Sequence, residues 1–390
     1  MNTSFLSRSP WIVCLAAGLF LWSACGVAGQ TSPPLLVPAP GSPLSVPAPG
    51  NLAAGDLNGD GYPDLVVTSG KEQSITILVN DGRGRFNSAS NSPLRLRFNP
   101  GEIALGDVNG DGNLDLGVAT HDSYVISLFA GDGKGGFKPT PDSPVSTRQG
   151  RRPHTHDLVF RDLNEDRKLD VLTVNSDDGT VSVLLGDGAG NFAPADSSPF
   201  AVGRSPYPLA IGDIDGDGKL DLLVPNVEDG DVSIMLGDGR GHFVPSGFSP
   251  LKAGTRGYFI APGDLNNDSR LDFVVSHDDS TEVSVWLNKG GQGFQAAPIS
   301  PLELNNRAFQ VAVVDMNKDS KLDLVLASNT SVTVMLGDGR ANFSAASGSP
   351  FPAGKGTWRL AVADLNNDAK RDVVCSNLES DTVTILIAGR

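Results

Sequence analysis

The sequence predicts an all-β fold, a seven-bladed β-propeller of four-stranded blades, from three observations. An acidic loop recurs seven times, at intervals of 51, 55, 51, 51, 51 and 49 residues. Each interval contains short runs of alternating apolar and β-branched residues, which is typical of strands, and no helical pattern. Units of about fifty residues with four strands have the length of propeller blades. A solenoid is the alternative, because its repeats also pack only against their neighbours.

The acidic loop carries oxygen-bearing side chains at its first, third, fifth and ninth positions, as in Asp213-Ile-Asp-Gly-Asp-Gly-Lys-Leu-Asp221. Ca²⁺ prefers six to eight oxygen ligands, and Gly at position six allows the sharp turn that brings them together. Asp, Asn and Gly also favour β-turns, so one copy alone would be weak support. Seven copies in one register predict up to seven Ca²⁺ sites. The predicted ligands are Asp56, Asn58, Asp60 and Asp64; Asp107, Asn109, Asp111 and Asp115; Asp162, Asn164, Asp166 and Asp170; Asp213, Asp215, Asp217 and Asp221; Asp264, Asn266, Asp268 and Asp272; Asp315, Asn317, Asp319 and Asp323; and Asp364, Asn366, Asp368 and Asp372.

The charge of the chain suits cations. Its 390 residues carry a formal net charge of −15, which seven Ca²⁺ would nearly neutralise. Nucleic acids and anionic membrane surfaces bind clusters of Lys and Arg, so we expect neither as a partner.

Residues 1–30 are predicted to be a cleaved signal peptide. Arg8 precedes the apolar run Trp11 to Trp22, which is too short to span a bilayer, and small residues follow. Ser23-Ala-Cys25 resembles a lipoprotein cleavage box, so a lipid anchor at Cys25 is an alternative. The other cysteines are Cys14 and Cys375, so the mature chain has no pair for an intrachain disulfide. We expect an exported monomer without a membrane span, located outside the cell, at its surface or in the periplasm.

Residues 31–390 are predicted to form one domain whose two ends close the ring. Six Gly-rich turns end on a Phe, and the Pro of a Ser-Pro pair stands seven residues after each Phe. The chain stops before a seventh such turn, but counting seven back from Pro43 gives the apolar residue Leu36. Residues 35–49 are therefore predicted to supply the outer strand of the last blade, which an open stack would leave unpaired.

With these loops, the Gly-Asp-Gly…Phe turns and the fifty-residue period, the chain resembles the FG-GAP/VCBS repeat family, which includes the integrin α-subunit propellers. The resemblance covers residues 35–390. It implies Ca²⁺ between the first and second strands of each blade, held by the four side chains of each loop. The chain departs from the pattern at loop position six, where Arg167, Ser269, Ser320 and Ala369 replace Gly. If this position requires a positive φ, each replacement costs about 1 kcal/mol and weakens Ca²⁺ binding in its loop.

The resemblance does not choose a function, because the family includes adhesion receptors, lectins and polysaccharide-lyase-like propellers. We favour a binding or adhesion module for carbohydrate or protein at the cell surface. An exported sugar-active enzyme and a purely structural surface protein are the alternatives. The weak catalytic candidates are Arg152, His154 and His156, in the unit lengthened to 55 residues, and His121 in the unit before. A solvated loop is the simpler interpretation, because no companion carboxylate can be placed near these histidines from sequence.

A ligand is expected on one particular face. Connections in a four-stranded blade alternate between two faces, so the acidic loops and Gly-rich turns share one, the loop face. The opposite face is expected to gather aromatic and basic residues near the axis: Tyr207, Arg256, Tyr258, Arg307, Phe309, Trp358 and Arg359. Exposed aromatic and Arg side chains are typical of binding hot spots. The alternative is that Tyr258 and Trp358 only fill the channel.

Overall fold

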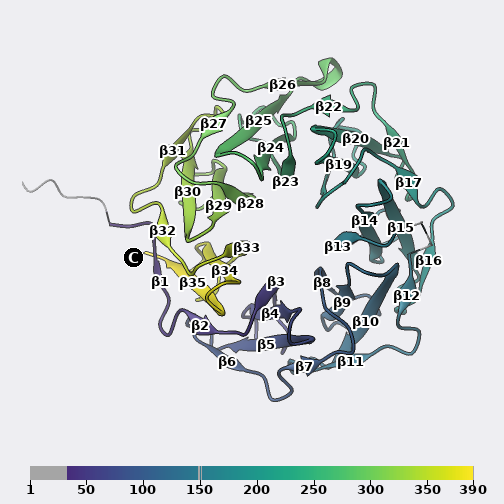
Figure 1. Cartoon of the computed structure of the whole chain (residues 1–390), viewed down its shortest axis with the longest axis vertical. Helices are drawn as coiled ribbons and strands as arrows, with labels where there is room; N and C mark the ends of the chain where they lie inside the picture. The colour runs from purple at the N-terminus through teal and green to yellow at the C-terminus, as the bar shows by residue number, and fades with distance from the viewer. Residues whose placement is uncertain (1–32, 148–149, 151, 390) are drawn as a thin grey trace, which may run out of the picture. The chain divides into compact units, whose positions relative to one another are not determined.

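The computed structural model describes residues 33–147, 150 and 152–389, and its seven antiparallel sheets stand in a ring (Figure 1). The predicted leader, with Cys14 and Cys25, lies outside the described residues, and Cys375 is buried as a free thiol. The described residues contain no α-helix, only the 3₁₀ turn η1 (Gly290–Gln292). Within them, no helix has the length and apolar character needed to cross a bilayer. The predicted seven-bladed propeller is confirmed.

Blade one shows the plan of all blades. The inner strand β3 (Pro49–Gly55) pairs with β4 (Asp64–Ser69), which pairs with β5 (Ser74–Asn80). The outer edge of β5 pairs with two short strands, β6 (Phe86–Ser88) and β7 (Leu94–Arg95). The predicted fourth strand is therefore present but interrupted.

The other blades repeat this order. Blades two to four contain, in order, β8 (Ile103–Gly106), β9 (Asp115–Ala119), β10 (Val125–Gly131), β11 (Phe137–Pro139) and β12 (Val145–Ser146); β13 (Thr155–Arg161), β14 (Asp170–Asn175), β15 (Thr180–Gly186), β16 (Phe192–Pro194) and β17 (Phe200–Ala201); and β18 (Ala210–Gly212), β19 (Asp221–Asn226), β20 (Asp231–Gly237), β21 (Phe243–Pro245) and β22 (Leu251–Lys252). Blades five and six contain β23 (Gly257–Gly263), β24 (Asp272–His277), β25 (Glu282–Asn288), β26 (Phe294–Ala296) and β27 (Leu302–Glu303); and β28 (Ala308–Val314), β29 (Asp323–Ser328), β30 (Ser331–Gly337), β31 (Phe343–Ala345) and β32 (Phe351–Pro352). Blade seven contains β33 (Thr357–Ala363), β34 (Asp372–Asn377) and β35 (Thr382–Ala388), together with β1 (Leu36–Pro38) and β2 (Leu44–Ser45).

A serine hydroxyl fills the interruption in each outer strand. In blade one the Ala89 N–H donates to the Ile77 carbonyl, and the Ile77 N–H donates to Ser92 Oγ at 2.9 Å. The chain bends away at this point, so the hydroxyl replaces the missing backbone acceptor. The contact recurs in all blades and explains the Ser of each Ser-Pro pair. The equivalent serines are Ser42, Ser143, Ser198, Ser249, Ser300 and Ser349.

The two ends of the domain close the ring. Strands β1 and β2 both pair with β35, side by side near the C-terminus in Figure 1. Leu36 lies opposite Ala388, as Phe86 lies opposite Asn80 in blade one, so Leu36 takes the predicted Phe position. Its side chain is 2% exposed and belongs to an apolar cluster with residues of blades six and seven. The predicted closure is confirmed.

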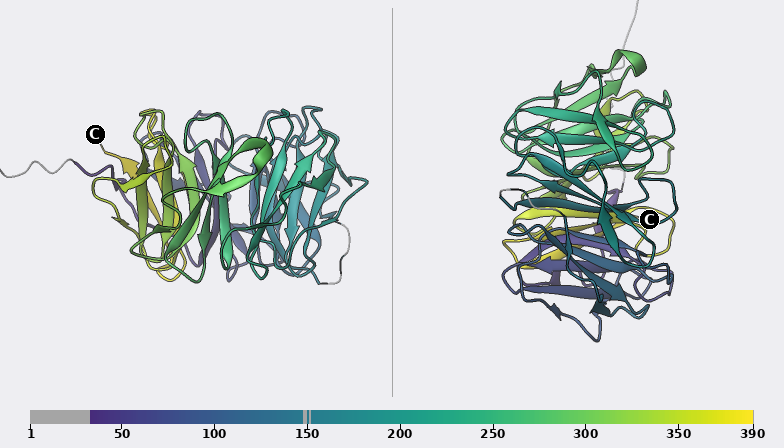
Figure 2. Two further views of the ribbon diagram at one scale, coloured as in Figure 1. Left: turned by 90° about the horizontal axis from the view of Figure 1, so that it is seen from above. Right: turned by 90° about the vertical axis from the view of Figure 1, so that its right-hand side faces the viewer.

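The core lies between neighbouring blades. Both faces of each sheet are covered, and the second strands, such as β4 and β14, are buried along their whole length. Val174 of blade three and Val224 of blade four, for example, belong to one cluster. Figure 2 shows the sheets standing next to one another around the ring. Burial of each such Val, Leu or Ile contributes about 1.5–3 kcal/mol to folding.

Candidate functional site

The acidic loops connect the first and second strands of each blade. In loop one, Asp56 Oδ1 accepts the Gly59 N–H and Oδ2 accepts the Gly61 N–H, both at 2.8 Å. The Asp60 N–H donates to Asn58 Oδ1 at 2.9 Å. The first carboxylate therefore shapes the loop backbone around itself.

The ninth carboxylate is buried and ties the loop to its blade. Asp221 Oδ2 accepts the Ile214 N–H, and Oδ1 accepts the Gly237 N–H, both at 2.8 Å. The other six loops repeat this pair of bonds, and every ninth Asp is at most 1% exposed. Burial raises the pKa of Asp170, Asp272 and Asp372 to about 6, although the backbone donors oppose it. The ninth Asp has a structural role that sequence reasoning missed.

Loop four tests whether the side chains fit Ca²⁺. One carboxylate oxygen from each of Asp213, Asp215 and Asp221 lies within 4.8 Å of the others. Oxygens that share one Ca²⁺ at 2.3–2.6 Å are at most about 5 Å apart, so these three fit a single ion. The other loops have Asn at the third position, which offers an amide oxygen.

Loop position six has a positive φ in every loop. Gly218 has φ 87°, and the four residues that replace Gly have 66° at Arg167, 64° at Ser269, 65° at Ser320 and 61° at Ala369. Position six therefore has the positive φ on which the expected cost of replacing Gly depends. Position four also has a positive φ throughout, which sequence reasoning missed although Gly stands there in three loops: Gly59, Gly110, Glu165, Gly216, Asn267, Lys318 and Asn367.

Several loops are bonded to the neighbouring blade. The carbonyl of Leu57 in loop one accepts the N–H of Gly135 in blade two at 2.9 Å. Across the closure, Asn80 Nδ2 of blade one donates to the carbonyl of Leu365 in loop seven at 2.8 Å. Leu57 and Leu365 are themselves buried. The shape of a loop therefore affects the contact between blades.

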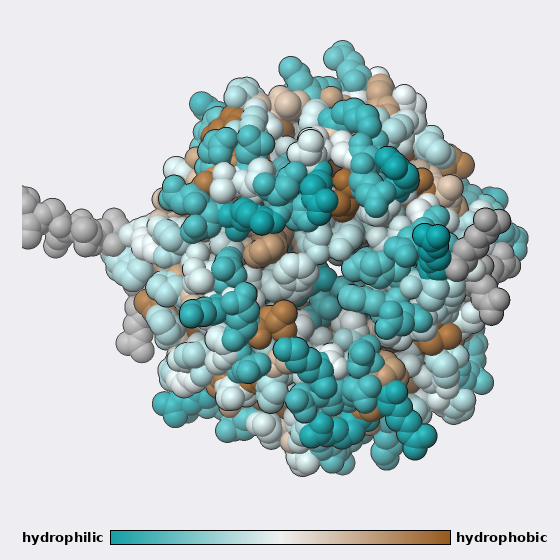
Figure 3. Space-filling view, in the orientation of Figure 1, coloured by the Kyte–Doolittle hydropathy of each residue, from teal (hydrophilic) through white to brown (hydrophobic). Residues whose placement is uncertain are grey.

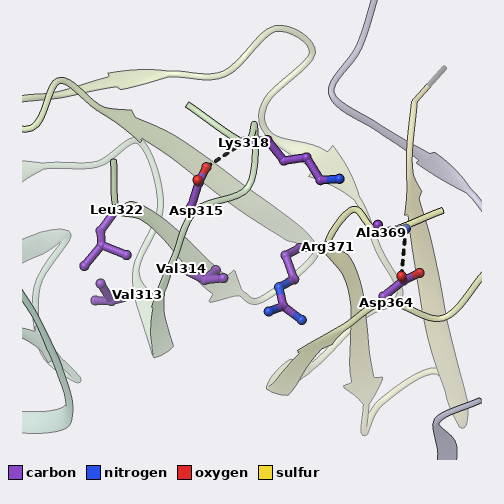
Figure 4. Close-up of a pocket in the computed structure, with 8 residues that line it drawn as sticks. All are labelled: Val313, Val314, Asp315, Lys318, Leu322, Asp364, Ala369 and Arg371. Atoms are coloured by element: carbon purple, nitrogen blue, oxygen red, sulfur yellow. Dashed lines mark hydrogen bonds between the residues drawn. The ribbon is translucent and has the colours of Figure 1, made fainter. Parts of the chain in front are cut away.

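The loop face is hollowed between loops six and seven (Figure 4). The cavity has a volume of about 630 Å³, and Asp315, Lys318, Asp364 and Arg371 contribute charges of both signs to its lining. Asp315 accepts the Lys318 N–H and Asp364 accepts the Ala369 N–H. The two acids belong to the predicted metal ligands, whereas no predicted ligand-face residue lines this cavity.

The opposite face gathers aromatic rings at one repeated position. Six residues before each loop's first Asp stand Gly50, Gly101, His156, Tyr207, Tyr258, Phe309 and Trp358. Contacts join the five rings, with centroids 4.2 Å apart for His156–Tyr207, 4.3 Å for Tyr207–Tyr258, 5.7 Å for Tyr258–Trp358 and 5.2 Å for Phe309–Trp358, so Trp358 of blade seven reaches Tyr258 of blade five past Phe309 of blade six. Tyr258 is buried, whereas Tyr207, Phe309 and Trp358 are half-buried. Tyr258 fills the channel, and the other three present part of their rings.

The predicted arginines have different surroundings. Arg256 is exposed and makes two bonds to Asp278, at 2.6 and 2.7 Å. Arg307 is exposed, with its guanidinium carbon 5.8 Å from the centre of the Phe309 ring. Arg359 instead lies buried in the channel, where its Nη2 donates to Glu102 Oε1 at 2.7 Å. Arg152 is exposed at the rim, and its N–H donates to Asp178 at 3.3 Å.

A second cavity, of about 240 Å³, lies among the inner strands. The residues that follow the aromatic position line it: Asn51, Glu102, Asp157, Pro208, Phe259, Gln310 and Arg359. Asp157 adopts a φ of 75° at a bulge in β13, and its Oδ2 accepts the Leu209 N–H at 2.8 Å. Burial and the nearby Glu102 raise the pKa of Asp157 to about 6.

The three histidines weighed as catalytic candidates come together beside this cavity. His154 Nε2 lies 3.0 Å from His156 Nε2, and His154 Nδ1 lies 2.9 Å from Asp177 Oδ1. The ring centroid of His121 is 4.9 Å from that of His156. Burial lowers the pKa of His156 to about 3. The companion carboxylates that could not be placed from sequence are Asp177 and Glu102.

Comparison with known proteins agrees with this fold. FG-GAP-like repeats match residues 56–118, 107–173, 162–224, 264–326 and 315–375. A T-cell immunomodulatory protein homolog of Plasmodium falciparum is 31% identical over 179 residues, which cover 43% of this chain and 24% of that protein. The matched region is thus about a quarter of the relative's length.

Two solved structures share the architecture. BBS1N, solved in complex with ARL6DN, is 13% identical, with a TM-score of 0.62 over 92% of this chain and 98% of that one. A lectin of Agrocybe aegerita that recognises non-reducing terminal N-acetylglucosamine is 19% identical, with a TM-score of 0.55 over 86% of this chain and 87% of that one. At these identities the likeness shows the fold alone. Because the repeats match more than half of the sequence, the chain belongs to the FG-GAP-like repeat family.

Proposed function

We propose that this protein is an exported, calcium-binding propeller that binds a carbohydrate at the face opposite its acidic loops. The calcium part rests on seven loops with one oxygen-rich side-chain pattern, whose fullest copy has carboxylates close enough to share an ion. When bound, Ca²⁺ would neutralise carboxylates that otherwise repel one another. In each loop the chain itself supplies the first Asp, which orders the backbone, and the ninth, which anchors it.

The cluster of aromatic rings is the observation that carries the ligand proposal. Tyr207, Phe309 and Trp358 present partly exposed rings around the channel, and the exposed Arg256 and Arg307 stand beside them. Aromatic surfaces combined with a few polar groups are typical of small-ligand sites, and a sugar ring offers both apolar C–H groups and hydroxyls to such a surface. The lectin with the same fold supports the ligand class by analogy only.

The rest of the surface favours a polar ligand. The face shown in Figure 3 is mostly hydrophilic, with apolar patches that are small and scattered. Over the part of the chain that the structure describes, the exposed large hydrophobic side chains are Val244, Phe248 and Leu378. A large apolar protein interface would need a broader continuous patch.

A glycan array probed with Ca²⁺ and with chelator tests the proposal. We expect saturable binding to a defined glycan, weakened at least about tenfold by Trp358→Ala or Phe309→Ala, which corresponds to about 1.4 kcal/mol. Val244→Ala is the matched control, because it removes an exposed apolar side chain from an outer strand. Binding to no glycan, or binding unchanged in both ring variants, contradicts a carbohydrate site here.

A sugar-active enzyme is the second candidate, because a histidine cluster with two carboxylates lies beside the axial cavity. Turnover of the bound glycan, lost in His154→Ala while melting is preserved, would favour the enzyme. Saturable binding without turnover favours the binding module.

A further inference from the structure

We propose that Glu102, His121 and His156 form a site for one divalent transition-metal ion of the Zn²⁺ class, with His154 as an additional ligand. This site is separate from the acidic loops, because it lies at the opposite end of the inner strands. It does not depend on the proposed calcium or carbohydrate binding.

The donor atoms are already gathered. Glu102, His121 and His156 each offer one ligand atom, and these atoms lie within 4.8 Å of one another. Zn²⁺ binds His nitrogen and carboxylate oxygen at about 2.0–2.2 Å, so two of its ligands in a tetrahedral site are about 3.4 Å apart. His121 is exposed, so a small rotation of its imidazole can close the remaining gap. Two imidazoles and a carboxylate suit Zn²⁺, whereas Ca²⁺ prefers oxygen alone.

His154 is held in position by a carboxylate. Asp177 Oδ1 can only accept a hydrogen bond, so His154 Nδ1 carries the proton that it donates across 2.9 Å. His154 Nε2 therefore carries the lone pair, and His156 Nε2 donates to it across 3.0 Å; a metal ion would take the place of this proton. A carboxylate on the far nitrogen of a ligating His is the usual arrangement at zinc sites.

The backbone makes room for His121. An added Cβ at Gly101 would lie 3.1 Å from Cδ2 and 3.3 Å from Nε2 of His121. Gly101 stands at the position that carries an aromatic ring in blades three to seven, so the missing side chain leaves the space that His121 occupies. The cluster is thus specific to blades two and three.

The local charge favours a cation. Glu102 Oε1 accepts a bond from Arg359, which leaves Oε2 for a metal. Asp157 lines the same cavity and supplies a second carboxylate near the single guanidinium. Two carboxylates beside one arginine leave a negative balance that a divalent ion would offset.

The test is a titration with Co²⁺ and then Zn²⁺ of protein that has been freed of transition metals and is kept in millimolar Ca²⁺, so that the acidic loops do not compete. We expect one equivalent of Co²⁺ with the visible absorption of nitrogen and oxygen ligation, displaced by Zn²⁺. His121→Ala should weaken Zn²⁺ binding more than about tenfold, and Asp177→Asn about 10–100-fold. Gly101→Ala should also weaken it, because it displaces His121 while keeping every ligand.

His242→Ala is the matched control, since His242 lies in the turn before β21 with its side chain 44% exposed, and this variant should bind Zn²⁺ like the unchanged protein. Melting in Ca²⁺ checks that each variant is folded. If His156→Ala fails this check, the exposed His121 provides the decisive variant. Absence of a stoichiometric site, or equal Zn²⁺ affinity in His121→Ala and the unchanged protein, overturns the proposal. Because no glycan is involved, this result is independent of carbohydrate binding.

Discussion

Loop position six offers a direct measure of backbone strain. Ala369 has φ 61°, and Gly218 has φ 87° with no atom within 4 Å of an added Cβ. Ala369→Gly should therefore stabilise the fold by about 1 kcal/mol, and Gly218→Ala should destabilise it by a similar amount. Chemical denaturation at fixed Ca²⁺ measures both. Equal stability of the two variants and the unchanged protein would show that φ at this position does not matter.

The third and ninth carboxylates of loop four should respond differently to calcium. Asp215 is exposed, so Asp215→Ala should leave the free energy of unfolding in chelator nearly unchanged. In Ca²⁺ it should remove the part of the increase in this free energy that loop four contributes. Asp221→Ala should destabilise in both conditions, because it leaves the buried N–H groups of Ile214 and Gly237 unbonded at about 1–3 kcal/mol each. Denaturant melts with Ca²⁺ and with chelator separate the roles. If Asp215→Ala loses as much stability in chelator as in Ca²⁺, Asp215 is not a calcium ligand.

At the scale of the strand, closure depends on the N-terminal segment. A chain that begins at Asn51 lacks β1 and β2, so the outer edge of β35 loses its backbone partners and the pocket of Leu36 opens. We expect it to aggregate or to melt well below a chain that retains residues 33–50. A peptide of residues 33–50 added in trans should restore melting. Equal melting of the two chains would mean that the segment contributes nothing to closure.

Features set by local sequence could be predicted, and features set by distant contacts could not. The strands follow from the period-two alternation of apolar residues, and the acidic loops follow from the repeated Asp positions. The closure follows from the Gly-rich turn that is missing from the last unit. Glu102 and Arg359 are 257 residues apart, and nothing in the sequence marks them as an ion pair. The same limit hid the approach of Glu102 and Asp177 to the histidines. Position four of the loops was predictable, because Gly59, Gly110 and Gly216 already indicated a positive φ.

At the scale of the whole molecule, calcium in one loop should stabilise more than its own blade. The Leu57 carbonyl of loop one accepts a hydrogen bond from Gly135 of blade two, and Asn80 of blade one donates to the Leu365 carbonyl of loop seven across the closure. The ring should therefore melt in one cooperative transition, with no early loss of single blades. Calorimetry compares the calorimetric enthalpy with the van't Hoff enthalpy. A calorimetric value well above the van't Hoff value would show that blades unfold separately.

The melting temperature in millimolar Ca²⁺ and in chelator tests the central claim most directly. A site at tenfold excess of Ca²⁺ over its Kd adds about 1.4 kcal/mol to the free energy of unfolding, and the chain has seven loops. We expect Ca²⁺ to raise the melting temperature by several degrees, and Mg²⁺, which keeps its waters, to raise it less. Melting curves that coincide in Ca²⁺ and in chelator would contradict calcium binding by the acidic loops.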